Sequence, residues 1–79
     1  MSHKILLFGI TKDIMGGTVH EAGGSFVTVG ELRHYLYSTY PQLEKLNSLM
    51  IAVNNNYAND EAALQPADEI ALIPPVSGG

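Results

Sequence analysis

The chain contains no cysteine among its 79 residues, which excludes disulfide bonds, thiolate metal sites and cysteine nucleophiles. Basic residues are also scarce. Only Lys4, Lys12, Arg33 and Lys45 are present, they are scattered, and the net charge is −4. Because a nucleic-acid-binding domain normally carries a basic stripe that neutralises phosphates, we expect no nucleic-acid partner. Any reactive sulfur that this chain carries cannot be on a cysteine side chain.

Long apolar runs are missing as well. No stretch approaches the roughly 18 apolar residues that a membrane span requires. The apolar run that begins at Ile5 is too short for the core of a signal peptide, so we expect a cytoplasmic protein without a membrane segment. A chain of this length buries only about 60% of its unfolded surface and forms shallow clefts. These properties favour a binding module, carrier or subunit over an enzyme with its own pocket.

One main helix and several short strands are predicted. Thr28 and Glu31 form a capping box for a helix from about Val29 to Thr39, with Val27 and Leu32 as a hydrophobic staple. Short apolar runs and turn residues predict strands at residues 5–8, 18–22, 49–53, 57–58 and 70–73, and a helical turn at residues 10–15.

This order of elements predicts an α+β fold in which a mixed sheet carries the helix on one face. The first and last strands are expected side by side beneath that helix. This is the β-grasp, or ubiquitin-like, arrangement. We expect residues 1–74 to form the domain and residues 75–79 to form an extended C-terminal tail.

The tail differs in character from the domain. Pro74 and Pro75 prevent further sheet pairing and favour an extended backbone. The four residues after them can reach roughly 13 Å, at about 3.3 Å per residue. Gly78 and Gly79 lack side chains, so the end of such an arm can enter a narrow channel. Taken alone, however, a terminal diglycine is better explained as a frayed chain end.

Several motifs together resemble a known family, the small subunits of molybdopterin synthase, which are MoaD-type ubiquitin-like sulfur carriers of the MoaD/ThiS family. The proline pair before the diglycine is the most specific of them. Gly9, where the family commonly has alanine, and Pro66-Ala67, where it favours Asp-Gly, depart from its pattern. The segments that carry the resemblance are 68–79, Leu7-Phe8 with Lys12-Asp13 and Gly16, Thr28-Val29 with Glu31-Leu32, and Ala52-Val53-Asn54 with Asn56-Tyr57.

The resemblance implies a mechanism centred on the carboxylate of Gly79. An E1-like adenylyltransferase would adenylate it with ATP and magnesium, and a sulfur donor protein would convert it to a thiocarboxylate. The tail residues Pro75, Val76, Ser77 and Gly78 would then enter the large subunit, which uses the sulfur to convert a cyclic pyranopterin phosphate to molybdopterin. The resemblance also implies a heterotetramer, catalytic groups in the large subunit, and no cofactor bound by this chain.

Other candidate residues are weaker. Phe8, Leu72, Ile73 and Pro75 are predicted to form an apolar docking patch, with core packing as the stronger alternative for Leu72 and Ile73. The three histidines, His3, His20 and His34, lie in different predicted elements without the spacing of a metal site, so we interpret them as surface residues.

Three other functions remain open from the sequence. A thiamine-pathway sulfur carrier would share the tail chemistry, although such carriers usually lack the proline pair. A protein modifier of the ubiquitin type would use an activated Gly79 carboxylate to form isopeptide bonds with lysine. A purely structural ubiquitin-like interaction domain would not need a free C-terminus.

Overall fold

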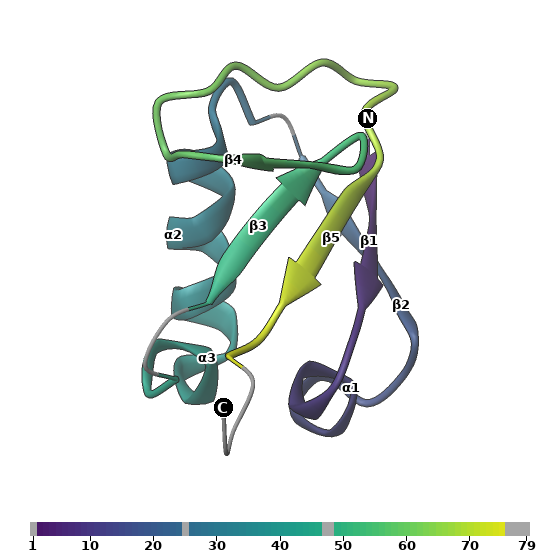
Figure 1. The fold of residues 1–79 in the computed structure, drawn as a ribbon, viewed down its shortest axis with the longest axis vertical. Coiled ribbons are helices and arrows are strands. Elements are labelled where there is room, and N and C mark those ends of the chain that lie inside the picture. Colours follow the sequence, from purple (N-terminus) through teal and green to yellow (C-terminus); the bar gives the residue numbers. More distant parts are fainter. Residues whose placement is uncertain (1, 25, 47–48, 76–79) are drawn as a thin grey trace.

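The computed structural model describes residues 2–24, 26–46 and 49–75. They form one five-stranded sheet with the strand order β2-β1-β5-β3-β4 and three helices, of which α2 covers one face of the sheet (Figure 1). In chain order the elements are β1 (Ser2–Leu7), α1 (Ile10–Met15), β2 (Val19–Gly23), α2 (Val29–Thr39), α3 (Pro41–Glu44), β3 (Met50–Val53), β4 (Asn56–Ala58) and β5 (Ile70–Ile73). The predicted mixed β-grasp sheet and its order of elements are confirmed.

The two ends of the domain meet in the middle of the sheet. β1 pairs with β5 in parallel, with Ile5 opposite Ile70 and Leu7 opposite Leu72, whereas the other strand pairs are antiparallel. A parallel pair requires a crossover connection, and here the intervening elements provide it. Both strands point toward the end of the molecule that carries α1 and α3 (Figure 1). The residues that follow β1 and β5 therefore lie close together at that end.

Helix α2 supplies the other half of the core. Val29, Leu32 and Leu36 are fully buried beneath it and pack with the buried residues of the central strands. Thr28 caps the helix, since its hydroxyl accepts a hydrogen bond from the Glu31 N–H at 3.3 Å. Such a cap contributes about 1 kcal/mol to stability. The Thr28 half of the predicted capping box is confirmed, whereas the Glu31 carboxylate accepts from the Val27 N–H at 3.2 Å and not from that of Thr28. The predicted staple is wrong, because Val27 is 65% exposed.

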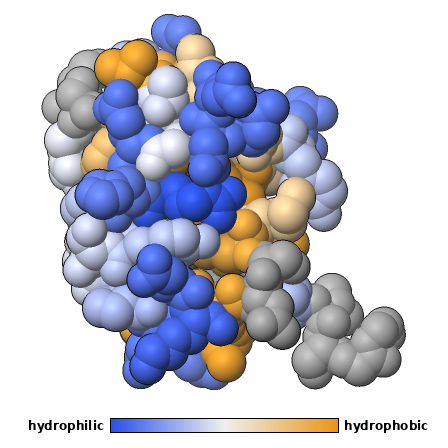
Figure 2. All heavy atoms as spheres, turned by 90° about the vertical axis from the view of Figure 1, so that its left-hand side faces the viewer, coloured by the Kyte–Doolittle hydropathy of each residue, from blue (hydrophilic) through white to orange (hydrophobic). Residues whose placement is uncertain are grey.

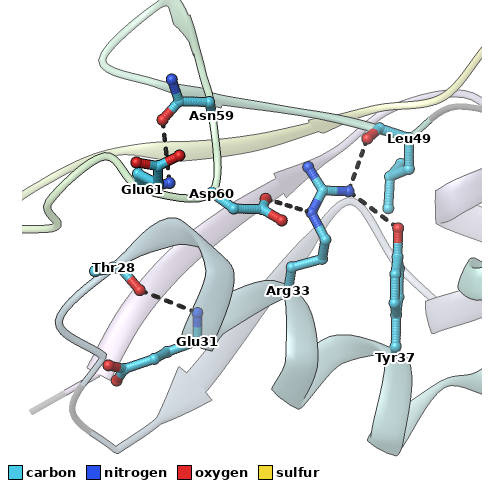
Figure 3. A network of polar contacts seen from close by, with 8 residues as sticks. All are labelled: Thr28, Glu31, Arg33, Tyr37, Leu49, Asn59, Asp60 and Glu61. Carbon is cyan, nitrogen blue, oxygen red and sulfur yellow. Dashed lines mark hydrogen bonds and ion pairs between the residues drawn. The ribbon is translucent and has the colours of Figure 1, made fainter.

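A polar network holds the 59–64 loop and the start of β3 against α2 (Figure 3). The Arg33 guanidinium donates to Asp60 Oδ1 at 2.8 Å, to Tyr37 Oη at 3.0 Å and to the Leu49 carbonyl at 2.9 Å. Partial burial lowers the pKa of Arg33, but the hydrogen bonds to Asp60 and Tyr37 outweigh that effect and raise it. Gly30 allows the loop to approach, since an added Cβ would lie 3.1 Å from the Asp60 carbonyl oxygen.

Within the described parts of the chain, no helix combines the length and the apolar character needed to cross a bilayer.

Candidate functional site

Among the described residues, no helix covers the face of the sheet opposite α2, and most of the side chains on that face are apolar. Side chains alternate between the two faces of a strand, so the register identifies the residues that share this face. Leu6 lies opposite Ala71, Ala71 opposite Ala52, and Met50 opposite Ile73. Lys4 and Glu21, paired across β1 and β2, also lie on this side of the sheet. We call the apolar part of the surface the open face, and its residues are Leu6, Phe8, Val19, Met50, Ala52, Tyr57, Ala71 and Ile73.

Large apolar side chains of the open face are exposed to solvent. Phe8 is 49% exposed, Met50 42% and Tyr57 68%. In Figure 2, which views the molecule from the left of Figure 1, apolar side chains gather right of the centre beside a polar area. These exposed side chains add little to the core of the chain itself, and exposed apolar patches commonly mark binding surfaces.

A hollow of about 310 Å³ lies in the open face and is lined by Leu6, Phe8, Ala52, Asn55, Tyr57, Ala71 and Ile73. Ala52 and Ala71 are paired across β3 and β5, and their short side chains leave space between larger neighbours. Phe8 and Tyr57, both largely exposed, stand at this hollow. The hollow can accept an apolar side chain of a partner, and no charged residue is among those that line it.

The predicted docking residues divide between the two faces of the sheet. Phe8 and Ile73 line the hollow of the open face. Leu72 is fully buried, because it points toward α2 and lies opposite Leu7 and Ile51 in the register. Its prediction as a docking residue is therefore wrong, and core packing, the alternative, is what the structure shows.

The predicted tail begins at the edge of this face. Pro75 is exposed. Val76, Ser77, Gly78 and Gly79, predicted as the inserted and reacting residues, lie outside the described residues. What the structure adds is the geometry of the point from which they start.

Pro74 rests against the turn that follows β1. A Cβ added to Gly9 would lie only 2.9 Å from Pro74 Cγ, so the proline ring occupies the place of a side chain at position 9. Gly9 also has φ +57°, a conformation that other residues rarely adopt. The sequence did not predict this contact. The unusual glycine at position 9 was the one available signal for it.

Thr11 fixes the same turn from inside. Its fully buried hydroxyl donates to the Phe8 carbonyl and accepts from the Phe8 N–H at 2.9 Å. The Thr11 N–H also donates to the Phe8 carbonyl, and the Lys12 N–H donates to the Gly9 carbonyl, both at 3.1 Å. The turn beside Pro74 is consequently well determined.

The histidines do not form a site, but their environment differs from the prediction. His3 is only 3% exposed, and its Nε2 lies 3.1 Å from the Gln65 carbonyl oxygen. His20 is half-buried and its ring meets that of Tyr40 edge-on. The interpretation as a surface residue is wrong for His3, which is buried on the α2 side of the sheet, whereas His20 on the same side keeps part of its surface in water. No group of three or more potential metal ligands occurs in the part of the chain that the structure covers.

Comparison with known proteins shows similarity over nearly the whole chain. Residues 5–79 match the model of the ThiS family. The molybdopterin synthase sulfur carrier subunit of Caenorhabditis briggsae is 37% identical over 83 residues, covering 100% of this chain and 99% of that protein.

Two solved structures extend this comparison. The complex of subunits 1 and 2 of the molybdopterin-converting factor from Helicobacter pylori contains a chain that is 29% identical, with a TM-score of 0.70 and full coverage of both chains. Small archaeal modifier protein 1 from Methanosarcina acetivorans is 26% identical, with a TM-score of 0.80 over 99% of this chain and 96% of that one.

Proposed function

The chain belongs to the ThiS family, and we propose that it is the sulfur carrier subunit of molybdopterin synthase. In this proposal the sulfur is carried on the carboxyl group of Gly79, as a thiocarboxylate. The observation that supports this most strongly is that the family match runs to Gly79 itself. A relative that bears this function in its name also aligns with the chain over 99% of its own length.

The chemistry requires activation of a poor electrophile. An oxygen of the Gly79 carboxylate attacks the α-phosphorus of ATP, pyrophosphate leaves, and an acyl-adenylate forms. The terminal sulfur of a persulfide on the donor protein then attacks the carbonyl carbon, AMP leaves, and an acyl disulfide forms. A second thiol, of the donor or of the activating enzyme, attacks the donor sulfur of this acyl disulfide. The donor is thereby oxidised to a disulfide, and the thiocarboxylate of Gly79 is released. We call Pro74 and Pro75, where the tail begins, the tail root. We assign the catalytic groups and the bound Mg·ATP to an E1-like adenylyltransferase, because the described surface of this chain has no convergent charged groups at the tail root.

The open face is the proposed docking surface for the large subunit. It adjoins the tail root through Phe8 and Ile73, so a partner that covers it is placed to receive the residues beyond Pro75. The similar Helicobacter pylori chain was solved together with a subunit 2, which supports a large-subunit partner. In the complex of this chain with its own large subunit, the sulfur would pass from Gly79 to a cyclic pyranopterin phosphate.

Complementation tests the proposal. In a strain that lacks its own sulfur carrier subunit, we expect this chain to restore molybdoenzyme activity and a Gly79 deletion to restore none, because the shortened tail places its carboxylate out of reach. Gly23→Ala is the matched control, since an added Cβ there meets no atom within 4 Å. Restoration of activity by the Gly79 deletion would exclude the proposed role of the terminal carboxylate.

The docking surface has its own test. Ile73→Ser should weaken binding to the large subunit, measured by titration calorimetry, because it removes apolar area from the open face. Val27→Ser is the control, because Val27 is also apolar and is 65% exposed, but it lies just before the N-terminus of α2 and outside the open face. Equal affinities for wild type and Ile73→Ser would show that the large subunit binds elsewhere.

A further inference from the structure

We propose that a groove between α1 and α3 is a second contact site for the large subunit, and that it takes an apolar side chain of that subunit with a basic residue beside it. The inference rests on the proposed function, because it concerns how the large subunit surrounds the tail root. We call this surface the helix groove. It shares no residue with the open face, and it is lined by Ile10, Asp13, Ile14, Gln42 and Leu46.

The size and the lining of the helix groove fit an apolar side chain. Its volume is about 370 Å³, similar to the 310 Å³ of the hollow in the open face. Ile10, Ile14 and Leu46 form its apolar walls. Ile14 and Leu46 also pack against the core, whereas Ile10 is 51% exposed and contributes little to it. The exposed half of this isoleucine is therefore available to a partner.

Exposed apolar side chains continue from the open face to the helix groove. In the described parts of the chain, six large apolar side chains are exposed. Four of the six belong to the open face, namely Phe8, Val19, Met50 and Tyr57. Ile10 is the fifth, and it follows the last open-face residue of the β1 end by only two positions. The exposed apolar surface thus extends past the end of β1.

The tail root lies between these two surfaces. The Pro74 ring occupies the place of a side chain at Gly9, the residue that separates Phe8 from Ile10. α1 and α3 lie at the end of the molecule where β5 ends (Figure 1). In the proposed complex the large subunit encloses the chain beyond Pro75, so it has walls on both sides of the tail root. One wall meets the open face, and the other meets the helix groove.

Asp13 gives the helix groove its charge. It is exposed, no other charged residue lines the groove, and it forms no ion pair within the described residues. Lys12, its neighbour in α1, does not line the groove. A carboxylate attracts a lysine or arginine of a partner and disfavours an acidic residue. The groove therefore fits an apolar side chain that has a basic neighbour.

Affinity for the large subunit, measured by titration calorimetry with the full chain, tests this inference. We expect Ile10→Ser to weaken binding by about 5- to 10-fold, since it removes apolar area from the groove and little from the core. Val27→Ser is the matched control, because Val27 is also exposed but lies outside both surfaces. Wild-type affinity in a folded Ile10→Ser variant would overturn the inference.

Asp13→Asn provides a second test, which decides the matter if Ile10→Ser fails to fold in a thermal unfolding assay. We expect it to weaken binding by up to about fivefold at low salt and to make the affinity less sensitive to salt, because one exposed ion pair is lost. Glu61→Gln is the control, since it removes the same charge from an exposed position outside both surfaces. A salt dependence equal to that of wild type would contradict the proposed basic neighbour.

The same titrations keep this inference apart from the proposed function. If the wild-type chain does not bind the large subunit, the proposed function fails. If wild type binds, Ile73→Ser binds weakly and both groove variants match wild type, the large subunit uses the open face alone and only the role of the helix groove is excluded. Groove variants that lose affinity for the E1-like enzyme alone would also overturn the inference.

Discussion

Leu72 and Ile73 are adjacent apolar residues of β5 that serve opposite sides of the molecule. Leu72 is fully buried against the α2 side, whereas Ile73 is partly exposed at the hollow of the open face. The alternation of strand side chains is the whole cause of this difference. The first residue therefore contributes mainly to folding, and the second is available to a partner.

The neighbouring pair gives a direct stability test. Leu72→Ala should lower the free energy of unfolding by about 2–5 kcal/mol, because it leaves a cavity in the core. Ile73→Ala should lower it by much less, since that side chain keeps part of its surface in water. Urea denaturation of both variants measures the difference, and equal losses would contradict the assignment of the two faces.

Thr11 offers a second test at the same scale. Thr11→Val preserves the shape of the side chain but removes the hydroxyl, leaving the Phe8 N–H without its acceptor at 2.9 Å. We expect a loss of about 1–3 kcal/mol in the free energy of unfolding. Thr11→Ser keeps the hydroxyl and should lose clearly less. If Ser and Val variants are equally destabilised, the hydrogen bonds to Phe8 are not what fixes the turn.

The sequence predicts whether a residue is buried or capped only in two cases. Either the interacting residues are close in sequence, or apolar and polar residues alternate along the element. The Thr28–Glu31 cap was predictable, because its partners lie three positions apart. In β5 all four residues from Ile70 to Ile73 are apolar, so nothing in the pattern distinguishes the buried face from the open one. The contact of Gly9 with Pro74 joins two ends of the chain and depends on the completed sheet.

Among the connections between elements, the β3–β4 turn is the best defined. Asn54 and Asn55 have φ angles of +53° and +71°, as the two central residues of a tight hairpin require. Asparagine adopts this left-handed backbone more readily than most residues. The segment that this turn contacts was not predictable from the sequence. The Asn54 side chain donates to Asp68 at 2.9 Å and accepts from the Glu69 N–H at 3.0 Å, so the turn is tied to the residues just before β5.

Asn55 tests the conformational demand of this turn. Asn55→Ala should lower the free energy of unfolding by about 1 kcal/mol, since alanine is strained in the left-handed region. Asn55→Gly should be neutral or stabilising, because glycine adopts a positive φ freely. Thermal unfolding of both variants gives the comparison, and a more stable alanine variant would be inconsistent with the turn as described.

Asp68 makes the link between the β3–β4 turn and the residues before β5 dependent on pH. Hydrogen bonds from the Gln65 N–H and the Asn54 side chain hold the pKa of Asp68 below its ordinary value of 3.8. A carboxyl with a lowered pKa in the folded state stabilises fully above its unfolded pKa and loses that contribution as the pH falls through the folded pKa. The affected window therefore lies in acid, below about pH 4.

We expect Asp68→Asn to flatten the loss of stability in this window. The measurement is the free energy of unfolding in urea at several pH values from about 6 down to about 2.5. The wild-type chain should lose stability toward the acid end more steeply than the variant. Parallel curves for the two proteins would show that Asp68 does not contribute through its charge.

At the scale of the whole molecule, the fold places the buried core on one face of the sheet and the exposed binding surface on the other. α2 and the inner face of the sheet bury the core, while the open face and the root of the tail lie together on the other side (Figure 1). The β-grasp topology was predictable because one helix and two apolar end strands leave few ways to bury both. The hollow of the open face was not, since it arises from two alanines that only the strand register brings together.

The central claim is that Gly79 carries sulfur, and the intact mass of the chain tests it most directly. The chain is isolated from cells that contain its sulfur-relay enzymes, and its mass is compared with that from cells lacking the E1-like enzyme. We expect a species in which one terminal oxygen is replaced by sulfur, and we expect it only in the cells that contain that enzyme. An unmodified terminal carboxylate in both samples, or lysine-linked conjugates with no thiocarboxylate, would contradict it.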